Sequence, residues 1–473
     1  MAKKNEIPAL ILSFATTLLL LAGGLWWFAR HTDLGRSLSQ SLPQGGPILG
    51  SKSSSKIPLD ERLSVGERLL VTSITSADKE AGIRAITSGN YAEAVTALQT
   101  SLQQNRNDPE ALIYLNNARI GTQKNLTLAV AVPATTSADP AEEILRGVAQ
   151  AQQQVNETGG ITGVPLRILI ANDDNDPSVA TQVAQALANN PAVLGVIGHF
   201  GSDTSLAAAQ VYQQAELVMV SPTSTSTRLS GLGNAIFRTV PSDRFTATAL
   251  SRYQINAAGV QNAVLYFNAE SDYSKSLKDE FTTALLSDGG QVVTEVNVAD
   301  PGFNAQASLQ QATQQGAEAI VLVTNTATLD QALQIIAANQ KRLPILGGDS
   351  LYTPKLLERG GRAEGMVVTV PWILLSNPNT PFVSKARQLW GGDVNWRTAM
   401  AYDATLAMVA GLAPNPSRKG LQSTLSGSGF TAQGATGAIR FLPSGDRNQA
   451  MQLVKVESGS RSGFGYDFVP VNP

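Results

Sequence analysis

The sequence predicts an α/β protein with two doubly wound lobes, each built on a parallel β-sheet, behind a transmembrane helix and a small α-helical segment. Three observations support this. The chain has 473 residues, too many for one ordinary domain. Its 43% apolar and 15% charged composition is typical of globular proteins. From Leu126 onward, strand-like apolar runs alternate with stretches long enough for helices, which favours parallel sheets covered on both faces.

The N-terminal region carries an apolar run, IPALILSFATTLLLLAGGLWWFA at residues 7–29, without a charged residue. Its length matches the roughly 20 residues that cross a bilayer, and Trp26 and Trp27 lie where an interfacial aromatic belt is expected. We expect an uncleaved transmembrane anchor, with a cleaved signal peptide as the alternative. Residues 32–58 are rich in Ser, Gly, Pro and Gln, which predicts a flexible linker.

Residues 60–121 are predicted to form a small helical segment. Apolar residues recur at helical spacing and are interrupted at Ser88-Gly89-Asn90 and at Asn107-Asp108-Pro109, which indicates two or three short amphipathic helices. The pattern GNYAEAV followed by NDPEAL resembles a tetratricopeptide repeat, over little more than one repeat. Because such repeats need neighbours to bury their faces, we expect this one to pack on the next domain, to serve as a helical spacer or stalk, or to bind a partner.

Hydroxyl-rich loops follow two of the predicted strands. The strand ending at Val196–Gly198 runs through HFGSDTS into a helix, and the next strand, LVMV, runs into SPTSTSTR at 221–228. Ligands of open parallel sheets bind beyond the carboxyl ends of the strands, and a helix N-terminus favours an anion there. We expect Ser202, Asp203 or Thr204 to cap that helix, with Asp203 facing away from an anion unless it caps.

A third strand end, ILGGDSLY, supplies Asp349. Two hydroxyl loops and one carboxylate would suit a zwitterion, with Ser202 and Thr225 holding a carboxylate and Asp349 holding an ammonium group. The alternative interpretation of each loop alone is a capped helix without a ligand.

Other functional classes are disfavoured by composition and motifs. The formal net charge is −2 and no dense basic cluster follows the N-terminus, so no nucleic acid partner is expected. The absence of cysteine excludes disulfides, thiolate metal sites, a cysteine nucleophile and a bacterial lipoprotein anchor. NDDNDP at 172–177 lacks the glycine and distal glutamate of a calcium loop, and we predict neither a metal nor a cofactor.

Catalysis is also not expected. His199, Ser202 and Asp203 are close in sequence, but three residues of one loop rarely reach triad geometry, and HFGSD lacks the second glycine of a nucleophile elbow. We expect His199 to hydrogen-bond to backbone. The sequence also contains no phosphate-binding G-x-x-x-x-G-K-[ST] loop.

Three segments carry a family resemblance: NETGGITGVPLRILIANDDNDP, VIGHFGSDTSLAAAQVY and VMVSPTSTST. In order and spacing they resemble the leucine/isoleucine/valine-binding family, the type I solute-binding proteins of ABC transporters, from Leu126 to near the C-terminus. The resemblance implies the type I periplasmic-binding fold with hinge strands between lobes. We expect lobe one at 126–241 plus 372–434, and lobe two at 242–371 plus 435–473.

The resemblance also implies ligand-binding positions. Ser202 would grip the ligand α-carboxylate, Thr223 and Thr225 would contact the amino-acid backbone, and Asp349 would bind the α-ammonium. The full predicted set is Phe200, Gly201, Ser202, Thr223, Ser224, Thr225, Tyr273, Asn325 and Asp349. The chain departs from the family in its short first loop, PATTSADPAEE, and in Asn325 at an often aromatic position, which leaves the side-chain end of the pocket open.

The function implied by the resemblance is that of a membrane-tethered, extracytoplasmic solute-binding protein. It would close around a small solute, an amino acid or related amide, and deliver it to an ABC permease. This places a single-pass chain in a bacterial cytoplasmic membrane, with the binding domain on the periplasmic or extracellular side. The alternative is a ligand-sensing receptor or partner-binding module that signals through the helical segment.

Overall fold

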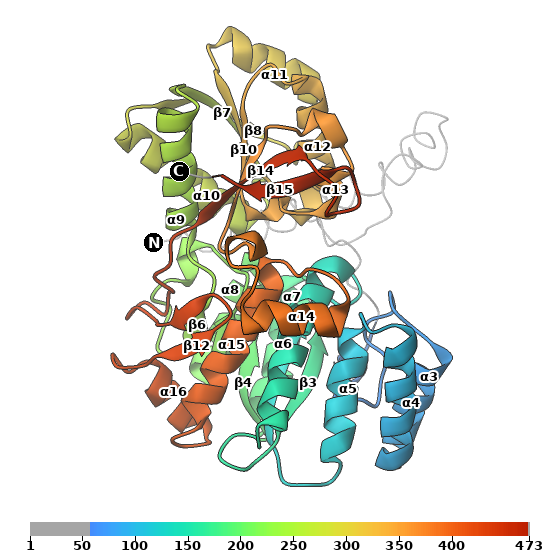
Figure 1. Ribbon diagram of the computed structural model, residues 1–473. Helices are drawn as coiled ribbons and strands as arrows, with labels where there is room; N and C mark the ends of the chain where they lie inside the picture. The colour runs from blue at the N-terminus through green and yellow to red at the C-terminus, as the bar shows by residue number, and fades with distance from the viewer. Residues whose placement is uncertain (1–56, 472–473) are drawn as a thin grey trace, which may run out of the picture. The chain divides into compact units, whose positions relative to one another are not determined.

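The computed structural model describes residues 57–471, which hold two sheets with their helices and an additional helical segment (Figure 1). The predicted anchor at 7–29 and nearly all of the predicted linker at 32–58 lie outside the described residues. Across 57–471, no helix combines the length and apolarity needed to cross a membrane.

The first sheet has the strand order β1-β3-β2-β4-β5-β6, and β2 to β6 run parallel. All seven residues of the central strand β2 are buried, because helices cover both faces of the sheet. Leu128 and Val130 pack with α6 and α15, whereas Ala129 and Ala131 pack with α7 and α8. The parallel strands are β2 (Leu126–Val132), β3 (Leu166–Asn172), β4 (Val193–Ile197), β5 (Val218–Ser221) and β6 (Ile236–Arg238). The helices are α6 (Ala138–Glu157), α7 (Pro177–Asn189), α8 (Ser202–Gln214), α14 (Pro381–Trp390), α15 (Trp396–Leu412) and α16 (Arg418–Leu425).

Helices α6 and α15 approach closely at Gly147. A Cβ atom at this position would lie 2.2 Å from the carbonyl oxygen of Thr398 and 2.7 Å from the backbone nitrogen of Tyr402. Only glycine permits this contact, because both neighbouring atoms belong to backbone. The close contact fixes the N-terminal end of α15 beside the first sheet.

The second sheet has the order β15-β14-β11-β10-β9-β7-β8. Its strands β7 to β11 run parallel, and β14 and β15 add antiparallel at one side. The strands are β7 (Asn262–Phe267), β8 (Gln291–Asn297), β9 (Ala319–Val323), β10 (Ile345–Gly347), β11 (Val367–Val370), β14 (Gln452–Ser458) and β15 (Tyr466–Pro470). The helices are α9 (Asp243–Arg252), continued by the π-turn η3 (Tyr253–Ala257), α10 (Asp272–Ser287), α11 (Ala305–Gln314), α12 (Leu329–Asn339) and α13 (Pro354–Leu357).

We call the first sheet with its helices lobe one and the second sheet with its helices lobe two. The chain passes between them three times, after β6, after β11 and before β14. Short 3₁₀ turns complete the connections: η2 (Thr227–Leu229), η4 (Thr326–Thr328), η5 (Asp349–Leu351), η6 (Gly360–Arg362) and η7 (Leu374–Ser376). The hairpin of β12 (Ala432–Gly434) and β13 (Gly437–Ile439) spans the predicted lobe boundary at 434. The sequence-based lobe bounds remain a prediction.

The segment before lobe one contains η1 (Leu59–Arg62), β1 (Leu63–Ser64), α3 (Ala77–Thr87), α4 (Tyr91–Gln104) and α5 (Pro109–Ile120). Helices α3, α4 and α5 pack in sequence order, and α5 packs against α6 (Figure 1). Strand β1 pairs antiparallel with β3. The segment is therefore packed on lobe one, and its likeness to a tetratricopeptide repeat stays a prediction.

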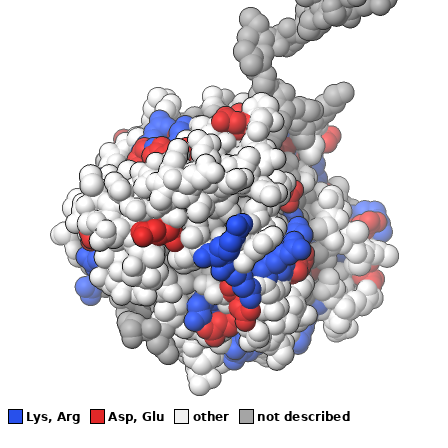
Figure 2. All heavy atoms as spheres, turned by 90° about the horizontal axis from the view of Figure 1, so that it is seen from above, with Lys and Arg blue, Asp and Glu red and all other residues white. Residues whose placement is uncertain are grey.

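Charged side chains are mixed in sign on the face of the molecule shown in Figure 2, where Lys and Arg lie next to Asp and Glu. Most of this face consists of residues other than Lys, Arg, Asp and Glu. It offers no broad basic surface of the kind that binds a nucleic acid backbone.

Candidate functional site

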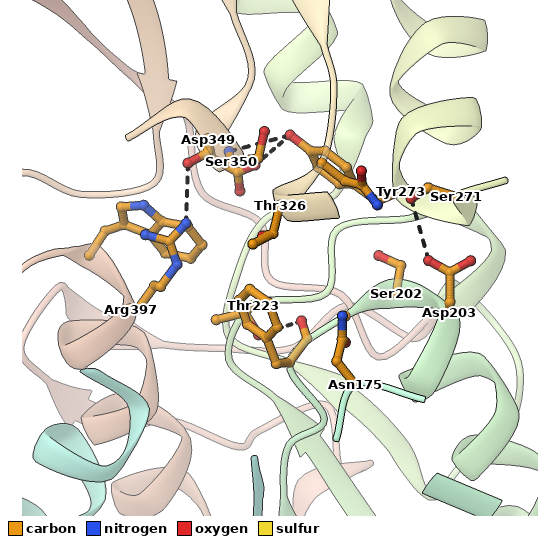
Figure 3. A pocket seen from close by; sticks show the side chains of 14 residues that line it. Asn175, Ser202, Asp203, Thr223, Ser271, Tyr273, Thr326, Asp349, Ser350 and Arg397 are labelled. Carbon is orange, nitrogen blue, oxygen red and sulfur yellow. Dashed lines mark hydrogen bonds between the residues drawn. The ribbon is translucent and has the colours of Figure 1, made fainter. Parts of the chain in front are cut away.

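A cavity lies where strand-end loops of the two lobes meet (Figure 3). Its volume is about 60 Å³, which corresponds to roughly four to six water molecules. The lining residues come from both lobes: Asn175, Phe200, Gly201, Ser202, Asp203, Thr223, Ser271, Tyr273, Asn325, Thr326, Asp349, Ser350, Trp396 and Arg397. The cavity is thus an internal space shared by the two lobes, and it adjoins a larger hollow of about 380 Å³.

Lobe one contributes the first turn of α8 and the loop after β5. Helix α8 begins at Ser202, after a four-residue loop that follows β4, so its unpaired N–H groups and the positive end of its dipole lie at the cavity. Thr223 lies beside this turn and donates its hydroxyl to the Phe200 carbonyl at 2.8 Å. The Ser202 hydroxyl accepts a hydrogen bond from the Ser226 N–H at 3.3 Å. This side of the cavity suits an anionic group.

Lobe two contributes a carboxylate. Asp349 opens the turn η5 after β10, is 3% exposed, and accepts a hydrogen bond from the Tyr273 hydroxyl at 2.7 Å. Burial raises the pKa of Asp349, although Tyr273 and the charge of Arg397 oppose the rise. A buried carboxylate of this kind is stabilised by a cation, so this side of the cavity suits an ammonium group.

Asp203 connects the lobes. Its carboxylate accepts hydrogen bonds from the Asp272 N–H at 2.8 Å and from the Ser271 hydroxyl at 3.4 Å, at the N-terminus of α10 (Figure 3). The expectation that Ser202, Asp203 or Thr204 caps α8 is wrong, since Gly201 is the N-cap residue and no side chain caps this helix. Asp203 supports a helix of the opposite lobe instead, which its own stretch of sequence does not reveal.

Seven of the nine predicted ligand-binding residues line the cavity, and Ser224 and Thr225 do not. The Ser224 hydroxyl lies 2.6 Å from that of Ser205, and the Thr225 carbonyl accepts from the Asp243 N–H at 2.9 Å. Both residues therefore hold the loop after β5 in place. Ligand contact by any of the nine remains a prediction.

Seven lining residues are absent from the predicted set: Asn175, Asp203, Ser271, Thr326, Ser350, Trp396 and Arg397. Asn175 and Ser350 stand at strand ends, and this position is a signal that sequence reasoning could have used. Trp396 and Arg397 begin α15, far along the chain, and only tertiary packing brings them here.

His199 is fully buried outside the cavity lining. Its Nδ1 lies 2.6 Å from Asp173 Oδ2, and its Nε2 lies 3.0 Å from the Tyr212 hydroxyl. The expectation of a backbone partner for the ring is wrong, because both ring nitrogens contact side chains. Within 57–471, no group of three or more His, Cys, Asp or Glu residues is arranged to hold a metal ion.

The Asp243 carboxyl has a pKa near neutral pH in the folded protein. It is fully buried at the start of α9, and burial raises its pKa from 3.8 to about 7, against the opposing hydroxyls of Ser276 and Thr225. Between pH 3.8 and about 7 the folded protein then binds one more proton than the unfolded chain. Each pH unit upward in this window therefore lowers the free energy of unfolding by about 1.4 kcal/mol.

Asp243→Asn is expected to flatten this slope in denaturant unfolding between about pH 5 and pH 7. Asp279→Asn, which alters an exposed carboxylate on α10, serves as the control and should retain the slope. Equal slopes in the wild type and Asp243→Asn would contradict the assignment.

Comparisons with known proteins agree with this architecture. A family model described as "Periplasmic binding protein" matches residues 126–461. "Leu/Ile/Val-binding protein homolog 1" of Brucella abortus is 33% identical over 177 residues, covering 36% of this chain and 46% of that protein. "Amino acid binding protein" of Pseudomonas aeruginosa is 28% identical over 157 residues, covering 33% and 42%. The chain spans less than half the length of these two curated relatives.

Among solved structures, an ABC transporter substrate-binding protein from Desulfitobacterium hafniense, in complex with Leu, aligns with a TM-score of 0.61 at 26% identity. The alignment covers 73% of this chain and 100% of that one. The predicted α/β architecture with parallel-sheet lobes is confirmed, whereas the predicted membrane helix lies outside the described residues.

Proposed function

The chain belongs to the periplasmic binding protein family, and from this we propose that it binds a small solute, an α-amino acid, in the cavity between its lobes. The observation that supports this best is the polarity of the cavity. The buried carboxylate of Asp349 lies on lobe two, and the first turn of α8 lies on lobe one. An ammonium group and a carboxylate joined by one carbon complement this pair of charges.

In this proposal Ser202 and the N–H groups of α8 hold the α-carboxylate, with Thr223 beside them. Asp349 and Tyr273 hold the α-ammonium. Contacts between the lobes, such as Asp203 to the N-terminus of α10, stabilise the closed form around the solute. The protein acts by binding and closure rather than by catalysis, and it needs no cofactor.

Ser202→Ala is expected to weaken amino-acid binding by about 1–3 kcal/mol, because the carboxylate loses a hydrogen-bond donor in a buried place. Calorimetry on the full-length protein, with ligands found by a thermal-shift screen of amino acids and amides, measures this loss. Ser178→Ala is the matched control, since Ser178 occupies the first turn of α7 in the same lobe and is exposed. Equal affinities for wild type and Ser202→Ala would contradict the assigned carboxylate site.

The proposal extends to transport. We propose that residues 7–29 tether the chain to a bacterial cytoplasmic membrane, with the lobes on the periplasmic or extracellular side, and that closed protein delivers its solute to an ABC permease. The similarity to an ABC transporter substrate-binding protein of Desulfitobacterium hafniense supports this transport context. Reconstitution with a candidate permease would test delivery by solute uptake.

A receptor role through the helical segment is the second candidate. The packing of α5 against α6 supports it, because it links the segment mechanically to the lobe that carries Ser202. Substitutions on the exposed face of α4 that abolish capture of a partner without altering solute affinity would favour this role. Unchanged capture would exclude it.

A further inference from the structure

We propose that Arg397 recognises a carboxylate on the solute's side chain, so that the cavity selects an acidic amino acid such as aspartate. This inference rests on the proposed function, because it names the class of amino acid that the same cavity takes. An acidic ligand differs from the leucine, isoleucine and valine after which the Brucella relative is named and from the Leu bound to the Desulfitobacterium protein.

Arg397 is a buried cation whose hydrogen bonds go to backbone carbonyls, while the charges of Asp349 and Glu143 act on it from further away. The side chain is 8% exposed, and it donates from Nη1 to the Tyr352 carbonyl at 3.2 Å and from Nη2 to the Asp349 carbonyl at 3.4 Å. Its guanidinium stacks on the Trp396 ring at 4.4 Å from the ring centroid. Throughout 57–471, no carboxylate oxygen pairs with it within 4.0 Å, and its Nε has no hydrogen-bond partner. Because its Nε–H group has no acceptor, this guanidinium can still donate a hydrogen bond to a carboxylate.

The position of Arg397 matches the direction in which a solute side chain would leave. Asp203 and Ser271 close one side of the cavity, and Arg397 lies on the opposite side (Figure 3). The space continues beyond Arg397 into a second hollow, and the residues that line both spaces are Phe200, Thr326, Ser350 and Arg397. With the α-carboxylate at Ser202 and the ammonium at Asp349, the third substituent points toward the guanidinium.

The cavity wall offers little to an aliphatic side chain. None of the fourteen lining residues is aliphatic, and three of them, Phe200, Tyr273 and Trp396, carry aromatic rings. A leucine side chain here would displace water from Arg397 without replacing its hydrogen bonds, which costs binding free energy.

Two of the three acids that line the second hollow are paired with a cation. Glu142 and Glu143 pair with Arg146 at 3.0 and 2.9 Å, and Glu143 also accepts a hydrogen bond from Thr398. Arg397 also bridges the lobes, since α15 packs in lobe one and its acceptors lie in lobe two. A role limited to bridging would affect all solutes equally, whereas carboxylate recognition affects only acidic ones.

The test compares L-aspartate with L-asparagine, which are nearly isosteric and differ in side-chain charge, together with L-leucine and L-alanine. Calorimetry on the full-length wild type should show aspartate preferred over asparagine by about tenfold or more. Arg397→Gln should reduce that ratio to within about threefold. Arg418→Gln is the matched control, because Arg418 also donates to backbone carbonyls, at 2.8 Å to Val193, but outside the cavity. It should keep the wild-type ratio.

Two results would overturn the inference: a wild-type preference for a neutral amino acid, or an equal loss of aspartate and asparagine affinity in Arg397→Gln. The wild-type ratio decides the matter even where Arg397→Gln does not fold. Binding of a neutral amino acid that depends on Ser202 would reject the acidic selectivity and keep the proposed function. Folded wild type that binds no amino acid would reject both.

Discussion

Asp349→Asn is expected to weaken amino-acid binding by about 2–5 kcal/mol, a loss of roughly thirtyfold to several thousandfold in affinity. The substitution keeps the size of the side chain but removes the only charge that we assign to the ligand ammonium. Because Asp349 is buried, water cannot replace the missing partner, and the ammonium would be left in a desolvated site. Calorimetry at neutral pH on the full-length protein measures the loss.

Ligand chemistry provides the control for this substitution. An analogue that lacks the α-ammonium should bind wild type and Asp349→Asn with similar affinity, because it never uses the carboxylate. Glu364→Gln, on an exposed carboxylate of lobe two, should leave the amino-acid affinity unchanged. If Asp349→Asn weakens the analogue as much as the amino acid, the residue supports the loop rather than the ammonium.

Lys79→Met is expected to lower the free energy of unfolding of the helical segment by about 3–5 kcal/mol. The Lys79 side chain is fully buried, with its Nζ 2.9 Å from Asp108 and 2.8 Å from Glu110. Burial lowers the pKa of Lys79, but the two carboxylates outweigh it and raise the pKa. Removing the cation leaves two buried carboxylates without a counter-charge, which is costlier than the lost attraction itself.

The double variant Lys79→Met with Glu110→Gln should recover part of this loss, because one of the stranded charges is removed with the cation. Lys341→Met, which breaks an exposed ion pair with Glu364, should cost at most about 1 kcal/mol. Chemical denaturation followed by far-UV circular dichroism measures all three variants. Equal stabilities of Lys79→Met and Lys341→Met would refute a role for the buried ion cluster.

Features with a local signal were predictable from the sequence. The alternation of apolar runs and helical stretches gave the two-lobed α/β architecture, since buried parallel strands read as continuous apolar segments. Ser202 and Asp349 were predicted from their places in loops that follow strands, and both line the cavity. Thr225, predicted from the same kind of loop, does not line it, and Thr223 was implied only by the family resemblance. The strand-end rule and the family resemblance together therefore located seven of the fourteen lining residues.

The other half of the wall depends on packing between distant segments. Trp396 and Arg397 belong to α15, whose residues are buried almost all round, so no amphipathic pattern marks one end as facing a cavity. The prediction for Asp203 concerned only its own helix, α8, whereas its carboxylate accepts a hydrogen bond from the first residue of α10 in the other lobe. Such contacts follow from how the lobes meet, which no stretch of sequence encodes by itself.

The pairing of β1 with β3 makes the segment before Leu126 part of the first sheet. In the sheet order, β3 has only β1 on its outer side. Asn117 of α5 satisfies further backbone groups at this outer edge of β3. Its amide oxygen accepts from the Ile168 N–H at 3.1 Å, and its amide nitrogen donates to the Ile168 carbonyl at 2.7 Å. Every residue of α5 except Arg119 is buried.

A chain trimmed to begin at Leu126 would expose the unpaired backbone groups of β3 and the apolar surface beneath α5. An exposed strand edge beside apolar surface is a template for pairing with another copy, and hence for aggregation. The segment from Leu59 to Ile120 therefore protects lobe one from self-association, in addition to any role as a spacer or a partner surface.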